Sequence, residues 1–287
     1  MSLGLDRYAV LGNPVAHSRS PFIHAEFARQ TGQPIRYGRV LCPMDGFEAA
    51  VRAFAASHEE GAGPALGCNV TIPFKFEAPR LAARVSARAA LAQAANVLRF
   101  DADGWSADNT DGIGLVRDLQ HNADFDLAGA RVLLIGAGGA AAGVLGPLIE
   151  AGAREVVVAN RTVARAAALV ERHRAPSTRA ALSATGLAGC GEHFDLVINS
   201  SASSVNGIAA PVAHAVLRSG ALAVDLMYGP PAAPFINWAQ AHGARARDGL
   251  GMLVEQAAEA FWYWRRVRPQ TAPVLHALRE HMARAEA

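Results

Sequence analysis

The 287-residue sequence is almost without lysine. Lys75 is the only lysine, and all the remaining residues among the 27 lysines and arginines are arginine. An arginine side chain has a pKa above about 12 and cannot exchange a proton at working pH, whereas an ammonium group can be tuned into an acid or a base. Drift in an arginine-rich chain would also leave a single lysine. If one position needs an amine for proton transfer, Lys75 is that position.

An excess of charge is also missing. The net charge is +2 and 18% of the residues are charged, so there is no electrostatic reason to expect a nucleic-acid or membrane partner. The N-terminus reaches Asp6 and Arg7 before any long apolar stretch. The uncharged run from Val132 to Ile149 contains five glycines and Pro147, which favours a buried strand turning into a helix over a membrane span. We expect a cytoplasmic protein.

Cysteine is scarce. The three cysteines, Cys42, Cys68 and Cys190, are far apart, odd in number and outside any CxxC pattern. This arrangement suggests neither a disulfide framework nor a zinc site, and buried free thiols are the simplest interpretation. The histidines are scattered as well, so we expect no metal.

What the sequence does contain is an alternation of short apolar runs with helix-like segments, which is typical of α/β proteins with parallel strands. With 51% hydrophobic residues, the chain is long enough for two domains with ample cores. The expected strands are residues 8–11, 65–70, 131–135, 155–159, 195–199 and 221–226. The expected helices are residues 20–30, 45–57, 110–119, 139–151, 163–173 and 252–266.

The domain boundaries follow from the chemistry of the segments. A turn cluster at residues 101–104 closes a first α/β unit, and a phosphate-binding motif opens a second. We expect an N-terminal substrate-binding domain at 1–106, a Rossmann-like dinucleotide-binding domain at 107–248, and C-terminal helices at 249–287 that pack back on the first domain.

The phosphate-binding motif is Gly136-x-Gly138-x-x-Ala141, between the uncharged strand at 131–135 and a helix. The glycine pattern alone is weak, but a second strand follows at the distance expected of a βαβ unit. In that context Gly136 would make the tight turn, Gly138 would let the backbone approach a pyrophosphate, and the helix N-terminus would hold its negative charge.

The end of the second strand indicates which dinucleotide binds. An NAD site usually has Asp or Glu there, whereas this chain has Asn160, Arg161 and Thr162, with Arg165 one turn further. A carboxylate would repel a 2′-phosphate, and guanidinium groups attract it, so the sequence favours NADP. The residues that these two motifs predict to bind the cofactor are Gly136, Ala137, Gly138, Gly139, Ala140, Asn160, Arg161, Thr162 and Arg165.

Polar clusters follow other expected strands. Ser18 and Ser20 precede a helix, where Ser20 could simply be its N-cap. Asn69 and Thr71 are two residues apart and would point to one side of an extended segment. One aspartate of Asp108 and Asp111 could cap the helix that follows. The pairing of Lys75 with Asp111 does not follow from their spacing.

Seven motifs resemble those of the shikimate dehydrogenase family, in the family's order. They are residues 8–21 (YAVLGNPVAHSRSP), 67–75 (GCNVTIPFK), 109–114 (NTDGIG), 136–140 (GAGGA), 160–162 (NRT), 225–230 (DLMYGP) and 248–256 (DGLGMLVEQ). The resemblance runs nearly end to end. It implies an NADP-dependent reductase that converts 3-dehydroshikimate to shikimate in aromatic biosynthesis.

The resemblance also implies roles for individual residues. Lys75 and Asp111 would form the catalytic pair, and Lys75 would protonate the alkoxide that forms when hydride reaches the substrate carbonyl. Ser18 and Ser20 would hold the substrate carboxylate, with Tyr228 nearby. Met227 and Gly249, in the motifs at 225–230 and 248–256, would contact the cofactor. The residues that would hold the substrate hydroxyl groups are Asn69, Thr71, Asn96, Asp111 and Gln256.

The chain departs from the family pattern at Val97, where threonine is usual, and at Ser204, where glycine is usual near the cofactor. Serine is less free than glycine at positive φ. These departures keep open a quinate/shikimate dehydrogenase with relaxed substrate or NAD use. A non-catalytic NADP-binding sensor, which would not need Lys75, and a methylenetetrahydrofolate dehydrogenase, which would not need the serine pair, also stay open. Monomer and homodimer are both compatible with the sequence.

Overall fold

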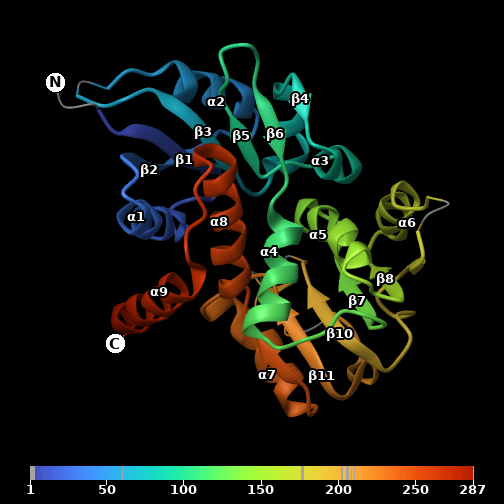
Figure 1. The fold of residues 1–287 in the computed structure, drawn as a ribbon. Coiled ribbons are helices and arrows are strands. Elements are labelled where there is room, and N and C mark those ends of the chain that lie inside the picture. Colours follow the sequence, from blue (N-terminus) through green and yellow to red (C-terminus); the bar gives the residue numbers. More distant parts are fainter. Residues whose placement is uncertain are drawn as a thin grey trace. The chain divides into compact units, whose positions relative to one another are not determined.

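The computed structural model describes residues 4–59, 61–175, 178–201, 203–204, 207, 209 and 211–286. The chain forms two compact units, one made of residues 1–114 and 253–287 and the other of residues 115–252. Each unit has its own sheet (Figure 1). The expected α/β class with two sheets is confirmed. The domain junctions expected at 106/107 and 248/249 stay a prediction.

The sheet of the first unit has the strand order β2-β1-β3-β5-β6-β4. Its strands are β1 (Asp6–Gly12), β2 (Ile35–Leu41), β3 (Ala65–Val70), β4 (Arg84–Val85), β5 (Val97–Arg99) and β6 (Ser106–Asp108). β1 runs parallel to β2 and β3, whereas β5 runs antiparallel to both β3 and β6. The first sheet is therefore mixed, and the turn cluster at 101–104 connects β5 to β6.

The first unit contains several helices or parts of helices, and proline and glycine mark the start and the end of the first of them. They are α1 (Ser20–Thr31), α2 (Phe47–Ala56), α3 (Ala87–Ala92) and α9 (Thr271–Glu286), with most of α8 (Leu250–Arg265). α1 has Pro21 in its first turn, and Gly32 ends it with a left-handed φ of 65°. α9 lies beside α1 (Figure 1), and Trp264 of α8 donates a hydrogen bond to the carbonyl of Leu98 at 2.9 Å. The C-terminal helices thus pack on the first unit, as expected.

The core of the first unit is formed by apolar residues of β1, β3 and the segments around them. Leu11, Cys68, Phe74 and Leu98 are fully buried there. Phe74 begins a 3-10 turn, η1 (Phe74–Phe76), and its ring stacks on Phe47 with 4.7 Å between centroids. Because the first residue of η1 is anchored in the core, the position of Lys75 on that turn is fixed.

The sheet of the second unit is parallel throughout, with the order β12-β11-β10-β7-β8-β9. Its strands are β7 (Arg131–Ile135), β8 (Glu155–Ala159), β9 (Ala181–Thr185), β10 (Phe194–Asn199), β11 (Leu217–Asp225) and β12 (Arg245–Arg247). This is the order of a doubly wound dinucleotide-binding sheet, and β7 and β10 flank its switch point. Residues 132–135 are fully buried, which explains the uncharged run in the sequence.

Helices α5 (Gly139–Glu150), α6 (Val163–Arg172) and α7 (Ala233–Ala241) belong to the second unit. The helix expected at 110–119 is α4 (Asp111–Arg117), which continues as a π-helical turn over Asp118–Asn122. The run from Val132 to Ile149 forms β7, a glycine turn and most of α5. Within the described ranges, the chain has no helix of the length and apolarity that a bilayer crossing requires.

Candidate active site

The most direct contact among the expected site residues joins Lys75 to Asp111. Lys75 lies on η1, just after β3, and Asp111 is the first residue of α4. The Lys75 Nζ lies 2.6 Å from Asp111 Oδ2, and the two side chains are 16% and 5% exposed. Although 36 residues separate them, the fold brings an ammonium and a carboxylate together in a nearly buried pair, which sequence spacing could not predict.

Asn96 holds the other side of Asp111. Its Nδ2 donates to Asp111 Oδ1 at 2.8 Å and also lies 3.1 Å from Gln256 Oε1. Its Oδ1 accepts from the backbone N–H of Thr110 at 2.8 Å, while the N–H of Asp111 bonds Asn109 Oδ1 at 3.1 Å. The turn before α4 is therefore fixed by side-chain amides, and Asp111 has both carboxylate oxygens engaged.

Gln256 reaches this group from α8 because α4 carries a glycine where the two helices meet. A Cβ on Gly114 would lie 2.6 Å from the Gln256 backbone nitrogen and Cβ, closer than real Cβ contacts allow. The glycine thus permits the close approach that puts Gln256 Oε1 within reach of Asn96. The Gln256 Nε2 donates to the carbonyl of Leu253 at 2.8 Å, which fixes the orientation of the amide.

Asn69, near the end of β3, lies next to the same group. Its Nδ2 donates to the backbone carbonyl of Asn96 at 3.1 Å, and its Oδ1 accepts from the Tyr37 hydroxyl at 2.7 Å. Thr71 follows β3 directly, and its N–H bonds the carbonyl of Leu11 at 2.9 Å. Lys75, Asn69, Asn96, Asp111 and Gln256 thus form one polar group within the first unit.

The serine pair lies before α1. The Ser18 hydroxyl donates to Ser20 Oγ at 3.2 Å and accepts from the Ser20 N–H at 3.3 Å. Arg39 fixes this loop, since its Nη2 donates to the carbonyl of Ser18 at 2.6 Å. Ser20 is the first helical residue, and Arg19 is the N-cap. The N-cap explanation for Ser20 is therefore wrong, and its hydroxyl points to another role.

The second unit carries the glycine motif at the end of β7. Gly136 has a φ of 111°, and a Cβ there would lie 2.7 Å from Ser200 Oγ, so only glycine fits. A Cβ on Gly138 would meet nothing within 4 Å. Gly138 is also the N-cap of α5 and places no side chain over the free N–H groups of the first turn. The N-terminus of α5 has the open backbone that a pyrophosphate needs, and Ala137, Gly139 and Ala140 belong to the same turn.

The turn between β8 and α6 carries the residues expected at the ribose end of a dinucleotide. Asn160 Nδ2 donates to the carbonyl of Thr162 at 2.9 Å, which closes the turn. Thr162 is the N-cap of α6, and both Arg161 and Arg165 are exposed. Their guanidinium groups are open to a ligand phosphate.

Ser204, where the family usually has glycine, joins a buried cluster. Its hydroxyl donates to Asp225 Oδ2, and Asn199 Nδ2 donates to Ser204 Oγ at 2.9 Å and to Asp225 Oδ2 at 3.0 Å. Burial raises the pKa of Asp225, against the lowering effect of the hydrogen bonds from Ser204, the Met227 N–H and Asn199. Ser204 is not among the described non-glycine residues with positive φ. The serine therefore introduces an additional anchor and no backbone strain.

Of the remaining expected residues, Met227 and Tyr228 follow β11, and Gly249 follows β12. The Met227 N–H donates to Asp225 Oδ1 at 2.8 Å, and the Gly249 N–H donates to the Met227 carbonyl at 2.8 Å. Tyr228 is the next residue and belongs to the second unit. The other departure, Val97 in β5, is fully buried. A threonine hydroxyl there would require a hydrogen-bond partner, so valine is suited to this position.

Sequence reasoning did not single out Tyr37, Arg88 or Asp108 as neighbours of this polar group, which the structure shows them to be. Tyr37 lies in β2 and Arg88 in α3. Neither segment was expected to contribute a residue to the site. Asp108 was considered only as a cap. Among the described residues, there is no group of three or more His, Cys, Asp or Glu side chains that could hold a metal ion.

Three family descriptions match the chain. "Shikimate dehydrogenase substrate binding domain" matches residues 10–98, "Shikimate / quinate 5-dehydrogenase" matches residues 118–230, and "Shikimate 5'-dehydrogenase C-terminal domain" matches residues 249–279.

Similar proteins carry the same family name. "Shikimate dehydrogenase (NADP(+))" from Methylibium petroleiphilum is 63% identical over 276 residues, which is 96% of this chain and 94% of the relative. The protein of that name from Verminephrobacter eiseniae is 58% identical and covers 97% of this chain and 96% of its own length. Shikimate 5-dehydrogenase from Thermus thermophilus in complex with shikimate has a TM-score of 0.83 at 30% identity, over 97% of this chain and 100% of that chain. The chain belongs to the shikimate dehydrogenase family.

Proposed function

We propose that the chain catalyses the reversible, NADPH-dependent reduction of 3-dehydroshikimate to shikimate in aromatic amino-acid biosynthesis. The observation that carries the proposal is the Lys75–Asp111 pair at 2.6 Å, surrounded by the amides of Asn69, Asn96 and Gln256. The relatives named shikimate dehydrogenase (NADP(+)) support both the substrate and the cofactor. A shikimate 5-dehydrogenase from Thermus thermophilus has been solved with NADP(H) and shikimate, at 28% identity and a TM-score of 0.80 over 96% of this chain and 99% of that chain.

Several groups in the first unit suit a small polyhydroxylated acid. Ser18 and Ser20 would donate hydrogen bonds to the carboxylate. The family resemblance adds Tyr228 as a further residue for this group. The donors and acceptors proposed for the substrate hydroxyls are Asn69, Thr71, Asn96, Asp111 and Gln256. Amides that are already fixed by neighbours bind a ligand at low entropic cost.

Lys75 would perform the proton transfer. When bound, NADPH would supply the hydride for the C3 carbonyl carbon of 3-dehydroshikimate. The carbonyl oxygen then gains negative charge, and Lys75 donates a proton from Nζ to that oxygen. In the oxidation of shikimate the neutral amine takes the proton back. Asp111 would orient the amine through its Oδ2, since Asn96 holds its Oδ1.

The second unit suits NADP on structural grounds. The open N-terminus of α5 at Gly138 would receive the pyrophosphate. The exposed Arg161 and Arg165 would pair with the 2′-phosphate, and no carboxylate stands at the end of β8 to repel it. We also propose a cytoplasmic location, which fits the free thiols of Cys42, Cys68 and Cys190. Monomer or homodimer stays a prediction.

The proposal is tested by initial rates at 340 nm with NADP⁺ or NAD⁺, each crossed against shikimate and quinate. We expect strong turnover only with NADP⁺ and shikimate. Turnover of quinate or a preference for NAD⁺ would move the chain to the quinate/shikimate branch, with Val97 and Ser204 as the residues to explain. A complete lack of turnover would favour a non-catalytic NADP-binding role.

The role of Lys75 is tested by Lys75→Arg beside Lys75→Met. Arginine keeps the positive charge near Asp111 but cannot give up a proton, so we expect kcat to fall by about 10²- to 10⁴-fold in both variants. Arg80→Met, which removes an exposed charge from the following 3-10 turn, should leave kcat unchanged. A Lys75→Arg enzyme with near-normal kcat would show that charge alone is needed and that the proton comes from elsewhere.

A further inference from the structure

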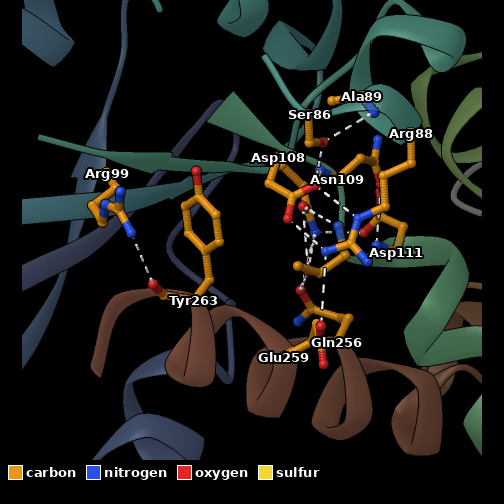
Figure 2. A network of polar contacts seen from close by, with 12 residues as sticks. Ser86, Arg88, Ala89, Arg99, Asp108, Asn109, Asp111, Gln256, Glu259 and Tyr263 are labelled. Carbon is orange, nitrogen blue, oxygen red and sulfur yellow. Dashed lines mark hydrogen bonds and ion pairs between the residues drawn. The ribbon is translucent and has the colours of Figure 1, made fainter. Parts of the chain in front are cut away.

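Arg88 lies between two buried carboxylates, those of Asp108 and Glu259, close to the proposed substrate residues. Its Nε and Nη2 donate to Asp108 Oδ1 and Oδ2 at 2.7 and 2.5 Å, and Nη2 lies 3.8 Å from Glu259 Oε1. Asp108 and Glu259 are each 4% exposed. Figure 2 shows the guanidinium group between the end of β6 and α8. One side chain of α3 thus connects two other elements of the first unit.

Asp108 links Arg88 to the catalytic pair. Its Oδ1 accepts the N–H of Asn109 at 2.7 Å, and Asn109 Oδ1 accepts the N–H of Asp111 at 3.1 Å. The backbone carbonyl of Asp108 accepts the N–H of Asn96 at 3.1 Å. The Asp108 side chain therefore fixes the start of the turn whose last residue is Asp111, and its backbone fixes Asn96.

Glu259 links Arg88 to the amide of Gln256. The two residues are three apart on α8, so they lie on neighbouring positions of one helix face. Glu259 Oε2 also accepts from Arg268 Nη1 at 2.8 Å. Because Glu259 is buried, these two guanidinium groups help to fix its position. A shift of Glu259 would move the helical turn that presents Gln256 to Asn96.

We propose that Arg88 is a positioning residue that holds Asp111 and Gln256 at the spacing needed to bind shikimate and to orient Lys75. The proposal rests on the proposed function. It uses a property that only arginine has, because a planar guanidinium can bond both oxygens of Asp108 and still face a second carboxylate. A lysine would supply one point charge and could not span both partners.

Three variants test this role. Arg88→Lys keeps a cation beside Asp108 but loses the bridge. Arg88→Met combined with Asp108→Asn removes the bridge without leaving an unpaired charge in the protein interior, so this double variant should fold even if Arg88→Met alone does not. Arg84→Met is the matched control, since Arg84 pairs with Asp101 and Asp103 at 3.0 and 3.1 Å at the same edge of the sheet but contacts none of the proposed substrate residues.

For each variant, kcat and the KM values for shikimate and NADP⁺ are measured, together with the melting temperature. We expect Arg88→Lys and the double variant to lower kcat by about 10- to 100-fold and to raise the shikimate KM, because a small misplacement of catalytic groups is costly. The NADP⁺ KM should stay at the wild-type value, since the proposed cofactor residues belong to the other unit. Arg84→Met should leave all three parameters unchanged.

A purely structural role for Arg88 predicts a different result. Partial unfolding would lower the apparent kcat and leave both KM values unchanged, and a folded double variant with wild-type kcat and shikimate KM would overturn the proposal. Shikimate affinity measured by calorimetry gives a readout independent of turnover, and it should weaken in the same two variants. If wild-type enzyme itself neither binds nor oxidises shikimate, the proposed function fails instead.

Discussion

At the scale of single residues, the amide of Asn69 is held from two sides. Tyr37 donates to its Oδ1 at 2.7 Å, so this oxygen must face the phenol, and the Nδ2 on the other side donates to the Asn96 carbonyl. Burial raises the pKa of the Tyr37 hydroxyl well above its usual range, which keeps the hydroxyl protonated and therefore a donor. The Asn69 side chain also lies close enough to His24 to oppose in part the lowering of the pKa of that ring by burial, so Tyr37, Asn96 and His24 together set the orientation of the amide.

Tyr37→Phe removes the donor that fixes this amide, together with the contact between the phenol and the Ser20 hydroxyl. The loss of one neutral hydrogen bond corresponds to about 1 kcal/mol, so we expect the shikimate KM to rise about fivefold with a smaller change in kcat. Steady-state kinetics with saturating NADP⁺ measures both. Tyr8→Phe is the control, because the Tyr8 hydroxyl contacts Arg265 and none of the proposed substrate residues. An unchanged KM in Tyr37→Phe would mean that Asn69 is fixed without the phenol.

Single residues also show which features of the site could be predicted from the sequence and which could not. Lys75 could be singled out by its chemistry, because it is the only amine side chain in the chain, and Asp111 by the resemblance of its motif. Their 2.6 Å contact depends on η1 and α4 meeting in space, which no local pattern encodes. Tyr37 and Arg88 were missed because each is an ordinary residue of its strand or helix, and its contact with the site comes from tertiary packing alone.

At the scale of elements, the turn from β8 to α6 carries the residues proposed to bind the 2′-phosphate, apart from the other proposed cofactor residues of the second unit. Its backbone is closed by the Asn160 amide, while Arg161 on the turn and Arg165 in the first turn of α6 are exposed to solvent. A positive charge on or beside a fixed turn can favour NADP, which has a 2′-phosphate, over NAD, which has none. Removing that charge should leave the preceding strand unchanged. Cofactor preference should therefore be separable from catalysis.

Arg161→Ala and Arg165→Ala should raise the NADP⁺ KM and leave kcat at saturating NADP⁺ unchanged. Hydrogen bonds between charged groups are stronger than neutral ones, so an increase of about tenfold is expected for each variant. The KM for NAD⁺, which has no 2′-phosphate, should not rise. Arg174→Ala, beyond the other end of α6, serves as the control. Equal effects on NADP⁺ and NAD⁺ would show that these arginines do not contact the 2′-phosphate.

Elements differ in how far they could be predicted. β7, β8 and β10 lie within one or two residues of the expected ranges, because each is a run of apolar side chains buried in a parallel sheet. β6 (Ser106–Asp108) and β12 (Arg245–Arg247) were not expected, since they are three residues long and mostly polar. Their pairing with neighbours makes them strands, and the polar end of β6 carries Asp108 to the site.

At the scale of the whole molecule, stability depends on a histidine in the aromatic core of the first unit. His24 is fully buried and stacks on Tyr37, with 4.2 Å between ring centroids and an interplanar angle of 6°. Within the described residues, neither ring nitrogen forms a hydrogen bond of normal geometry, although the Asn69 side chain lies near the ring. Burial lowers the pKa of His24 from 6.5 to about 3, and the Asn69 side chain opposes this shift only in part.

The sign of the pH effect follows from proton uptake. Between pH 6.5 and about 3 the unfolded chain protonates this histidine and the folded protein does not, so the free energy of unfolding falls as the pH falls through that window. Each pH unit corresponds to about 1.4 kcal/mol, and the loss at pH 5 relative to neutral pH is about 2 kcal/mol. Above pH 6.5 the histidine is neutral in both states and has no such effect.

His24→Phe should remove this dependence, because a phenyl ring can keep the stack on Tyr37 and cannot titrate. Urea unfolding at pH 7 and pH 5, followed by the intrinsic fluorescence of the four tryptophans, measures the difference. One of them, Trp264, has its ring centroid 5.5 Å from that of His24. Wild type and the exposed control His276→Gln should each lose about 2 kcal/mol more than His24→Phe between these pH values. Equal losses in all three proteins would mean that His24 becomes protonated in the folded protein as readily as in the unfolded chain, and the prediction would then be wrong.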